Sequence, residues 1–290
     1  EISRLRMDNR NIRSFVPQAK SISTSCNTLG CMKSITFLFL AFFLAAMPSA
    51  SGQDASYWQA QALSDHQNGS SNLALEDIEE YLALEPDDPW GWSFKANLLK
   101  DMNRYSEAVD SFDQIIRIDP DNAQAYNDRA LLLSGGLNQH DDALDSIKKA
   151  IEINPGNANY YFNMGIILEA QESYDDALQS YSQATTLNPS LAVAWYRQGM
   201  VYKDLEKIDE SLSSLSRALD LDASNADAWN EKGLALMDLG SRDEAVSCFE
   251  RAAAIEPSNL EFQNNLVMAK GGSDMQPDRI MEFGSNSQDA

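Results

Sequence analysis

Four oxygen-bearing side chains around residue 225 have the spacing of a calcium-binding loop. They stand at the first, third, fifth and twelfth ligand places of such a loop, as Asp220, Asp222, Ser224 and Glu231. The loop also needs glycine at its sixth place for a sharp turn, and this sequence has Asn225 there. The helical pattern described below puts Asp220 at the end of one helix and Glu231 inside the next. We therefore predict no calcium site.

A second candidate cluster is His140 with Asp141 and Asp142, whose side chains could ligate a metal ion. Two carboxylates at the start of a helix more often complement the positive end of the helix dipole. His66 is isolated, and no serine or cysteine nucleophile recurs with a histidine base in a way that the pattern below would bring together. The sequence therefore predicts no catalytic residue, no metal site and no cofactor.

These side chains belong to a sequence repeat. Six similar stretches of about 34 residues follow one another from Ala55 to Asn259, and they predict the helices that position the side chains. Each stretch has an aromatic residue at its fourth place, namely Trp58, Trp92, Tyr126, Tyr161, Trp195 and Trp229. A small residue stands four places later, at Ala62, Ala96, Ala130, Gly165, Gly199 and Gly233. Small residues allow helices to cross closely, and we expect the aromatic residue to fill the space that they leave.

The second half of each stretch repeats as well. A second small residue recurs at Ala74, Ala108, Ala143, Ala177, Ser211 and Ala245. A large apolar residue follows it by four places, at Ile78, Phe112, Ile147, Tyr181, Leu215 and Phe249. Each stretch closes on Pro86, Pro120, Pro155, Pro189, Ala223 or Pro257, and proline cannot continue a helix. The three- and four-residue steps predict two amphipathic helices in each stretch.

A chain with this pattern resembles the tetratricopeptide repeat family. The resemblance implies an all-α, right-handed superhelical solenoid of helix-turn-helix units, in which stacked neighbours bury the apolar faces. We place the six units at residues 55–88, 89–122, 123–157, 158–191, 192–225 and 226–259. Residues 260–270 form one further amphipathic helix that caps the last unit, and residues 271–290 are polar enough to predict a disordered tail.

Two units depart from the pattern. The third has one extra residue, which we place in its turn from Gly135 to Asp142, because loops tolerate added length at little cost. The fifth has Ser211 in place of a small apolar residue and Ala223 in place of the closing proline. We expect the fifth unit to be the weakest of the array.

Length and charge restrict the function. Six units and a cap use up the ordered part of the chain, which leaves no room for a catalytic domain and predicts a non-enzymatic protein. The chain has 22 basic and 44 acidic residues, a formal net charge of −22. Phosphate backbones and anionic lipids bind clustered lysine and arginine, so nucleic acid is not an expected partner, and no small-molecule substrate is evident.

The N-terminal part resembles an export signal. Met32 and Lys33 precede an apolar run from Ile35 to Met47, and small residues follow up to Gly52. This is the layout of a secretory signal peptide over residues 32–52, and an uncleaved membrane anchor is the alternative. We interpret residues 1–31 as an extension of the gene model. Cleavage after Gly52 would leave Cys248 as the sole cysteine, which predicts a buried, unpaired thiol in a secreted or extracytoplasmic protein.

The resemblance also predicts where a partner binds. In this family the first helices line a concave inner face that holds extended peptides or inserted helices. Transfer of that face predicts partner contacts at Phe94, Asn97, Asn127, Phe162, Asn163, Tyr196, Arg197, Met200 and Asn230. Amides can donate to and accept from a peptide backbone, and the aromatic and methionine side chains add apolar contact.

One branch of the family binds the carboxylate end of a chaperone tail through two lysines, two asparagines and an arginine. Asn163 and Arg197 match two of those five places, whereas Asn127 and Val193 stand where the lysines are needed. Chaperone-tail binding is therefore not expected.

The sequence thus predicts an exported, non-enzymatic module that binds a peptide or helix of a protein partner in the concave groove. The alternatives are a structural or assembly scaffold in the cell envelope and a regulatory subunit of a separate enzyme. Whether copies of the chain associate with one another is left open.

Overall fold

The computed structural model describes residues 54–271, and within this part of the chain the fold is all-α. The expected gene-model extension, the signal peptide and all of the tail beyond Gly271 lie outside the described residues. The helices are α3 (Ala55–Gln67), α4 (Ser71–Leu84), α5 (Pro89–Asp101), α6 (Tyr105–Ile118), α7 (Ala123–Leu137), α8 (His140–Ile153), α9 (Ala158–Ala170), α10 (Tyr174–Leu187), α11 (Ala192–Asp204), α12 (Ile208–Leu221), α13 (Ala226–Asp238), α14 (Arg242–Ile255) and α15 (Leu260–Ala269).

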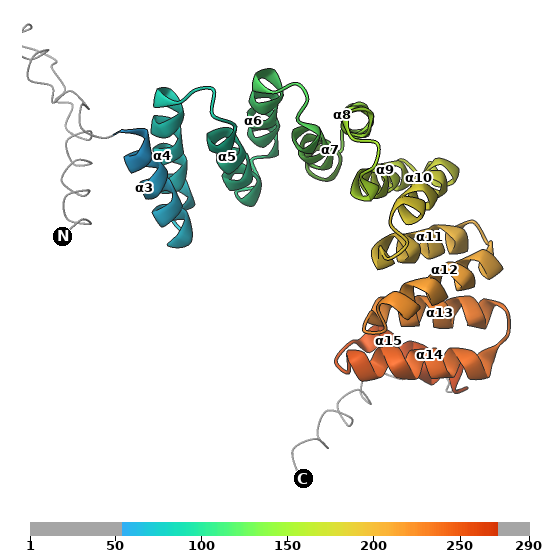
Figure 1. Cartoon of the computed structure of the whole chain (residues 1–290). Coiled ribbons are helices and arrows are strands. Elements are labelled where there is room, and N and C mark those ends of the chain that lie inside the picture. Colours follow the sequence, from blue (N-terminus) through green and yellow to red (C-terminus); the bar gives the residue numbers. More distant parts are fainter. Residues whose placement is uncertain (1–53, 272–290) are drawn as a thin grey trace, which may run out of the picture. The chain divides into compact units, whose positions relative to one another are not determined.

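The helices pack in the order in which they follow along the chain. The pairs α3 with α4, α5 with α6, α7 with α8, α9 with α10, α11 with α12 and α13 with α14 form the six helix-turn-helix units, and each pair packs on the next. First helices of successive units also touch, as α7 does with α9 and α11 with α13. Figure 1 shows the helix pairs following one another along the array. The predicted solenoid of paired helices is confirmed. Within residues 54–271, no helix combines the length and apolar character that crossing a membrane requires.

In each of the last three units a close contact joins the glycine of the first helix to the large apolar residue of the second. At Gly199 an added Cβ would lie 2.7 Å from Cγ of Leu215, and at Gly233 it would lie 2.6 Å from Cε1 of Phe249. Leu215 and Phe249 are buried, with 0% and 1% exposed. At Gly199 and Gly233 the two helices therefore approach so closely that even a Cβ would collide with the facing side chain.

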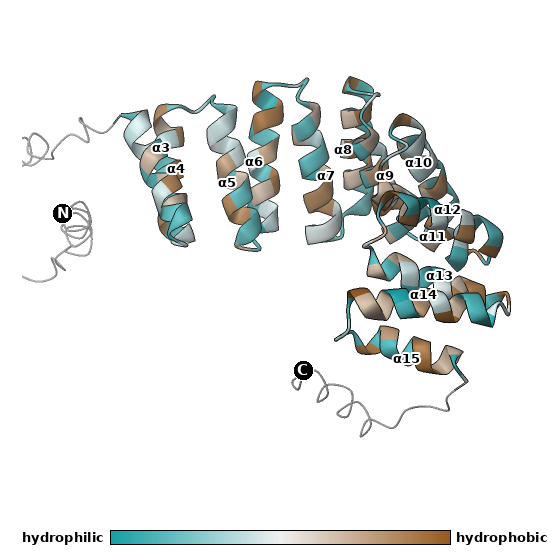
Figure 2. Ribbon diagram, turned by 60° about the horizontal axis from the view of Figure 1, so that its bottom comes forward, coloured by the Kyte–Doolittle hydropathy of each residue, from teal (hydrophilic) through white to brown (hydrophobic). Residues whose placement is uncertain are grey.

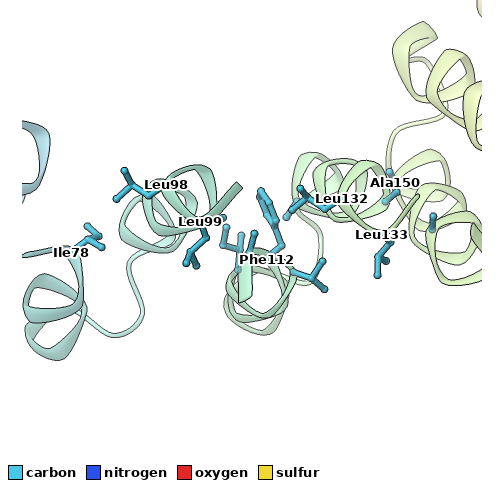
Figure 3. Packing of buried hydrophobic residues seen from close by; sticks show 14 of the residues in the cluster. Ile78, Leu98, Leu99, Phe112, Leu132, Leu133 and Ala150 are labelled. Carbon is cyan, nitrogen blue, oxygen red and sulfur yellow. The ribbon is translucent and has the colours of Figure 1, made fainter. Parts of the chain in front are cut away.

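The buried residues of successive units join into an extended core. One cluster runs from Ala62 to Ile167, and a second runs from Leu168 to Val201. Figure 3 shows part of the first, where Leu99 on α5, Phe112 on α6 and Leu132 on α7 lie along the same row of side chains. No single helix pair could bury such a surface alone, so each unit depends on its neighbours.

The aromatic residue at the fourth place has a different role from the one expected. It is only half-buried, and the large apolar residue of the second helix fills the space beside the small residue instead. In the second, fifth and sixth units this aromatic is a tryptophan whose Nε1 donates to a carbonyl at the end of the preceding unit, at 2.8 Å from Trp92 to Pro86 and 3.1 Å from Trp195 to Pro189. Trp229 does the same to Ala223 at 3.0 Å. In these three units the tryptophan thus links the unit to the loop before it.

The turn between the two helices of a unit contains one residue in the left-handed region. These residues are Gly69, Asn103, Asn138, Glu172, Glu206 and Gly240, with φ between 56° and 74°. We expected the extra residue of the third unit to lie in the loop between its helices. It instead lengthens the first helix, because α7 has 15 residues where the other first helices of the six units have 13. Adding residues to a helix end keeps their backbone groups hydrogen-bonded, which a longer loop would not do.

The fifth unit has two weak points besides the missing proline. An Asp or Asn side chain caps the first helix in each of the other five units, whereas Leu191 at the start of α11 has no side-chain cap. Ser211 is fully buried on α12, and its hydroxyl has no hydrogen-bond partner. Both features cost stability.

Restoring the cap of α11 should stabilise the protein. Leu191→Asn gives the free N–H groups of the first turn an acceptor, whereas Leu191→Ala removes the same apolar contacts without supplying one. We expect the asparagine variant to exceed the alanine variant by about 0.5–2 kcal/mol in the free energy of unfolding from urea melts. Equal stability of the two variants would contradict the role given to this cap.

Removing the unpaired hydroxyl should also stabilise the protein. We expect Ser211→Ala to raise the free energy of unfolding by about 1–3 kcal/mol, because no hydrogen bond is lost and a buried polar atom is removed. The matched control is Ser180→Ala, since the buried Ser180 hydroxyl donates to the carbonyl of Asp176 at 2.9 Å. The control should be no more stable than the parent, and an equal gain in both variants would refute the explanation.

Candidate functional site

The side chains predicted to contact a partner lie on the first helices of the second to sixth units. Phe94 and Asn97 are on α5, Asn127 is on α7, and Asn230 is on α13. Phe162 and Asn163 are on α9, and Tyr196, Arg197 and Met200 are on α11. The structure shows what each of these side chains contacts in the absence of a partner, whereas their role in binding stays a prediction.

A cluster of three aromatic side chains, His66, Trp90 and Phe94, lies between α3 and α5. The ring of Phe94 stacks on that of Trp90, with centroids 5.4 Å apart and planes inclined by 18°, and His66 of α3 meets Phe94 edge-on at 5.6 Å. Trp90 was not among the predicted contacts, although its spacing of four residues from Phe94 puts both on one helix face. Asn97 is exposed, and its amide donates to the carbonyl of Ser93 at 3.0 Å.

Two of the predicted amides are buried and bonded to the next unit. Asn127 is 4% exposed and accepts from Nδ2 of Asn163 at 2.7 Å. Asn230 is 2% exposed and accepts from Nδ2 of Asn265 on α15, also at 2.7 Å. A partner could reach these two amides only by displacing the amide that now bonds them. In the free chain they tie successive first helices together.

Ion pairs also join successive first helices. Arg197 on α11 pairs with Glu169 on α9, with Nη1 and Oε1 3.2 Å apart, and the buried Tyr181 donates to the other carboxylate oxygen at 2.6 Å. Lys203 on α11 pairs with Glu231 on α13. The side chain of Arg197 is nevertheless 43% exposed, so part of the guanidinium faces solvent.

Apolar surface remains between these polar pairs. Phe162, Tyr196 and Met200 are half-buried, and the ring of Phe162 lies 5.8 Å from that of Tyr181. The pKa of Tyr196 is raised to about 12, chiefly because burial disfavours the phenolate, and the carboxylates of Asp227 and Glu231 add to the effect. Around α9 and α11 the face therefore combines partly covered rings, a thioether and one partly exposed guanidinium.

The residues rejected as metal ligands have other partners. Nδ1 of His140 lies 3.0 Å from the Ser134 hydroxyl, and Asp141 accepts from Gln171 at 2.8 Å. Asp222 accepts from the backbone and the hydroxyl of Ser224 within its own turn. Within residues 54–271, no three histidine, cysteine, aspartate or glutamate side chains gather as a metal site would require.

Comparison with family models gives matches along most of the described units. Models described as tetratricopeptide repeat match residues 91–122, 111–145, 158–191 and 196–263. None of the curated proteins matches the chain.

Many solved structures have a similar fold. The structure of YrrB, described as "a TPR protein with an unusual peptide-binding site", is 23% identical with a TM-score of 0.53, over 67% of this chain and 97% of that one. A structure of PilW, described as a type IV pilus biogenesis factor, is 19% identical with a TM-score of 0.62, over 72% and 96%. PilF of Pseudomonas aeruginosa is 15% identical with a TM-score of 0.59, over 72% and 95%. At these identities the likeness shows the fold alone.

The raised pKa of Tyr196 makes stability depend on pH in the alkaline range. The unfolded chain loses this proton near pH ~10 and the folded chain near pH ~12, so the stabilisation is intact below ~10 and is lost as pH rises to ~12. Tyr196→Phe should therefore lose less stability than the parent over this range in urea melts. The exposed Tyr57→Phe is the control for a missing hydroxyl, and parallel curves for Tyr196→Phe and the parent would contradict the prediction.

Proposed function

Because the chain belongs to the tetratricopeptide repeat family, whose members are protein–protein interaction modules, we propose that it is a non-enzymatic adaptor for a protein partner. The partner supplies an extended peptide or a helix, which binds on the face of the first helices. The centre of the site is the surface of α9 and α11.

The observation that carries the proposal is the composition of this surface. Phe162, Tyr196 and Met200 present half-buried apolar groups, and Arg197 adds a guanidinium that is only partly used by Glu169. Aromatic and arginine side chains in partly desolvated positions most often dominate binding energy. Binding there would require little rearrangement, because the neighbouring polar groups are already held by their own partners.

The buried amides have a positioning role in this proposal. Asn127 and Asn230 hold successive first helices at a fixed spacing, so they would set the distance between the places on this face that the partner's side chains contact. Asn163 takes part both in positioning the helices and in the proposed contact surface, because it donates to Asn127 and is itself half-buried beside Phe162. The peptide-binding site ascribed to YrrB, which has a similar fold, supports a peptide ligand.

We further propose that the adaptor acts outside the cytoplasm. The support is the sequence pattern of residues 32–52, with its short apolar run and small residues before Gln53. A role in envelope assembly is the second candidate, since the pilus biogenesis factor PilW has a similar fold. In either case the bound molecule is another protein.

The test is a double substitution at the proposed centre. Peptides are first selected against the parent protein from a random display library, and their dissociation constants are measured by calorimetry. Tyr196→Ala with Arg197→Ala should weaken binding at least tenfold, or about 1.4 kcal/mol, while far-ultraviolet circular dichroism stays unchanged. Binding should also weaken as salt rises, because the acidic surface favours peptides with a basic flank.

The control removes one cation elsewhere. Lys149 on α8 pairs only with Glu152 of its own helix, three residues on, and both are exposed. Lys149→Ala therefore has the charge change of Arg197→Ala without touching α9 or α11. Normal binding by the Tyr196 and Arg197 variant, or an equal loss with Lys149→Ala, would rule out this site.

A further inference from the structure

The large residue of the second helix bears a hydroxyl in the fourth unit alone. There it is Tyr181 on α10, whose ring packs against Gly165 and is 0% exposed. In the other five units this residue has no polar group, and it is Ile78, Phe112, Ile147, Leu215 or Phe249. Phe249 makes the same contact with Gly233 as the tyrosine ring makes with Gly165. The packing therefore needs the ring alone, and the hydroxyl must have another role.

The Tyr181 hydroxyl connects the core to the candidate site. Its helix α10 packs against α9 of its own unit and α11 of the next (Figure 2). The hydroxyl donates to Oε2 of Glu169 on α9 at 2.6 Å, and Oε1 of the same carboxylate accepts from Nη1 of Arg197 on α11 at 3.2 Å. The pKa of Tyr181 is raised, chiefly because burial disfavours the phenolate, and the hydrogen bond to Glu169 adds to the effect. At neutral pH the hydroxyl therefore stays protonated and remains a donor.

Glu169 consequently holds Arg197 by one oxygen. Among residues 54–271, the bond from Nη1 to Glu169 is the only hydrogen bond that the Arg197 side chain donates, although a guanidinium has five N–H groups. Arg104 has the contrasting arrangement with Glu107, where Nε donates to Oε1 at 2.6 Å and Nη2 donates to Oε2 at 2.5 Å. In the described part of the chain no hydroxyl donates to the Glu107 carboxylate. A carboxylate with both oxygens free thus takes an arginine at two points, which is the preferred geometry of this pair.

We propose that Tyr181 is a positioning residue for the candidate site. By holding one oxygen of Glu169, its hydroxyl limits that carboxylate to a single bond with Arg197 and leaves the outer N–H groups of the guanidinium for an acceptor oxygen of the partner. The inference rests on the proposed function, because it assumes that the partner contacts Arg197. It goes beyond that function by assigning a role in binding to a fully buried residue.

The first test removes only the hydroxyl. Tyr181→Phe keeps a ring against Gly165, and it should weaken binding of the display-selected peptides about threefold or more in calorimetry, because Glu169 can then close on Arg197 with both oxygens. Tyr81→Phe is the matched control, since Tyr81 is also buried and its hydroxyl also donates to a carboxylate, that of Asp88 in the first unit. The control should bind as the parent does. An equal loss in both variants, or no loss in Tyr181→Phe, overturns the proposal.

The second test determines whether the loss acts through Glu169. Glu169→Gln has a neutral side chain with one acceptor oxygen, so it cannot take Arg197 at two points. In the Glu169→Gln background, adding Tyr181→Phe should therefore change peptide affinity by less than about twofold. A merely structural role of the tyrosine would give the same loss in both backgrounds, and that result overturns the proposal.

The third test needs no partner. Nitrogen-15 NMR follows the exchange of the Arg197 guanidinium protons with water, and the Arg197→Lys variant assigns the signal. Tyr181→Phe should slow this exchange about threefold or more, because the second oxygen of Glu169 then protects a further N–H group. An unchanged exchange rate overturns the inference whatever the peptides do. Slower exchange together with normal peptide binding by the Tyr196 and Arg197 variant would support the positioning of Arg197 and refute the proposed function.

Discussion

The rest of the structure depends on the close approach of two helices within each unit. A small residue on the first helix meets a large apolar residue on the second, as Gly199 meets Leu215 and Gly233 meets Phe249. The contact fixes how near the helices lie but leaves most of both apolar faces uncovered. Neighbouring units must therefore pack against each unit to bury these faces. Stability is therefore a property of the junctions between units as much as of the units themselves.

The junctions contain polar links that also shape the candidate site. Glu169 pairs with Arg197, and the amides of Asn127 and Asn163 bond across the same row of first helices. A face that must hold its own helices in register cannot offer every polar group to a ligand. The groups left for a partner are those whose bonding is incomplete, above all the Arg197 guanidinium and the rings beside it.

The fifth unit lacks supports that the other units have, yet α11, its first helix, bears Tyr196, Arg197 and Met200. This helix has no side-chain cap, and Ser211 leaves a hydroxyl unpaired in the core. Binding residues commonly lie in the less stable parts of a structure, where small rearrangements cost little.

The sequence alone determined the fold class and the pairing of helices, because a repeat of about 34 residues with fixed small and large places is compatible with few other arrangements. It also identified Ser211 as a weak point, since the other five units have alanine at the same place. Other features were decided only by the tertiary structure. The burial of Asn127 and Asn230, the pairing of Arg197 and the bonds from tryptophans to preceding carbonyls all join one unit to another, and a pattern within one unit carries no information on contacts between units.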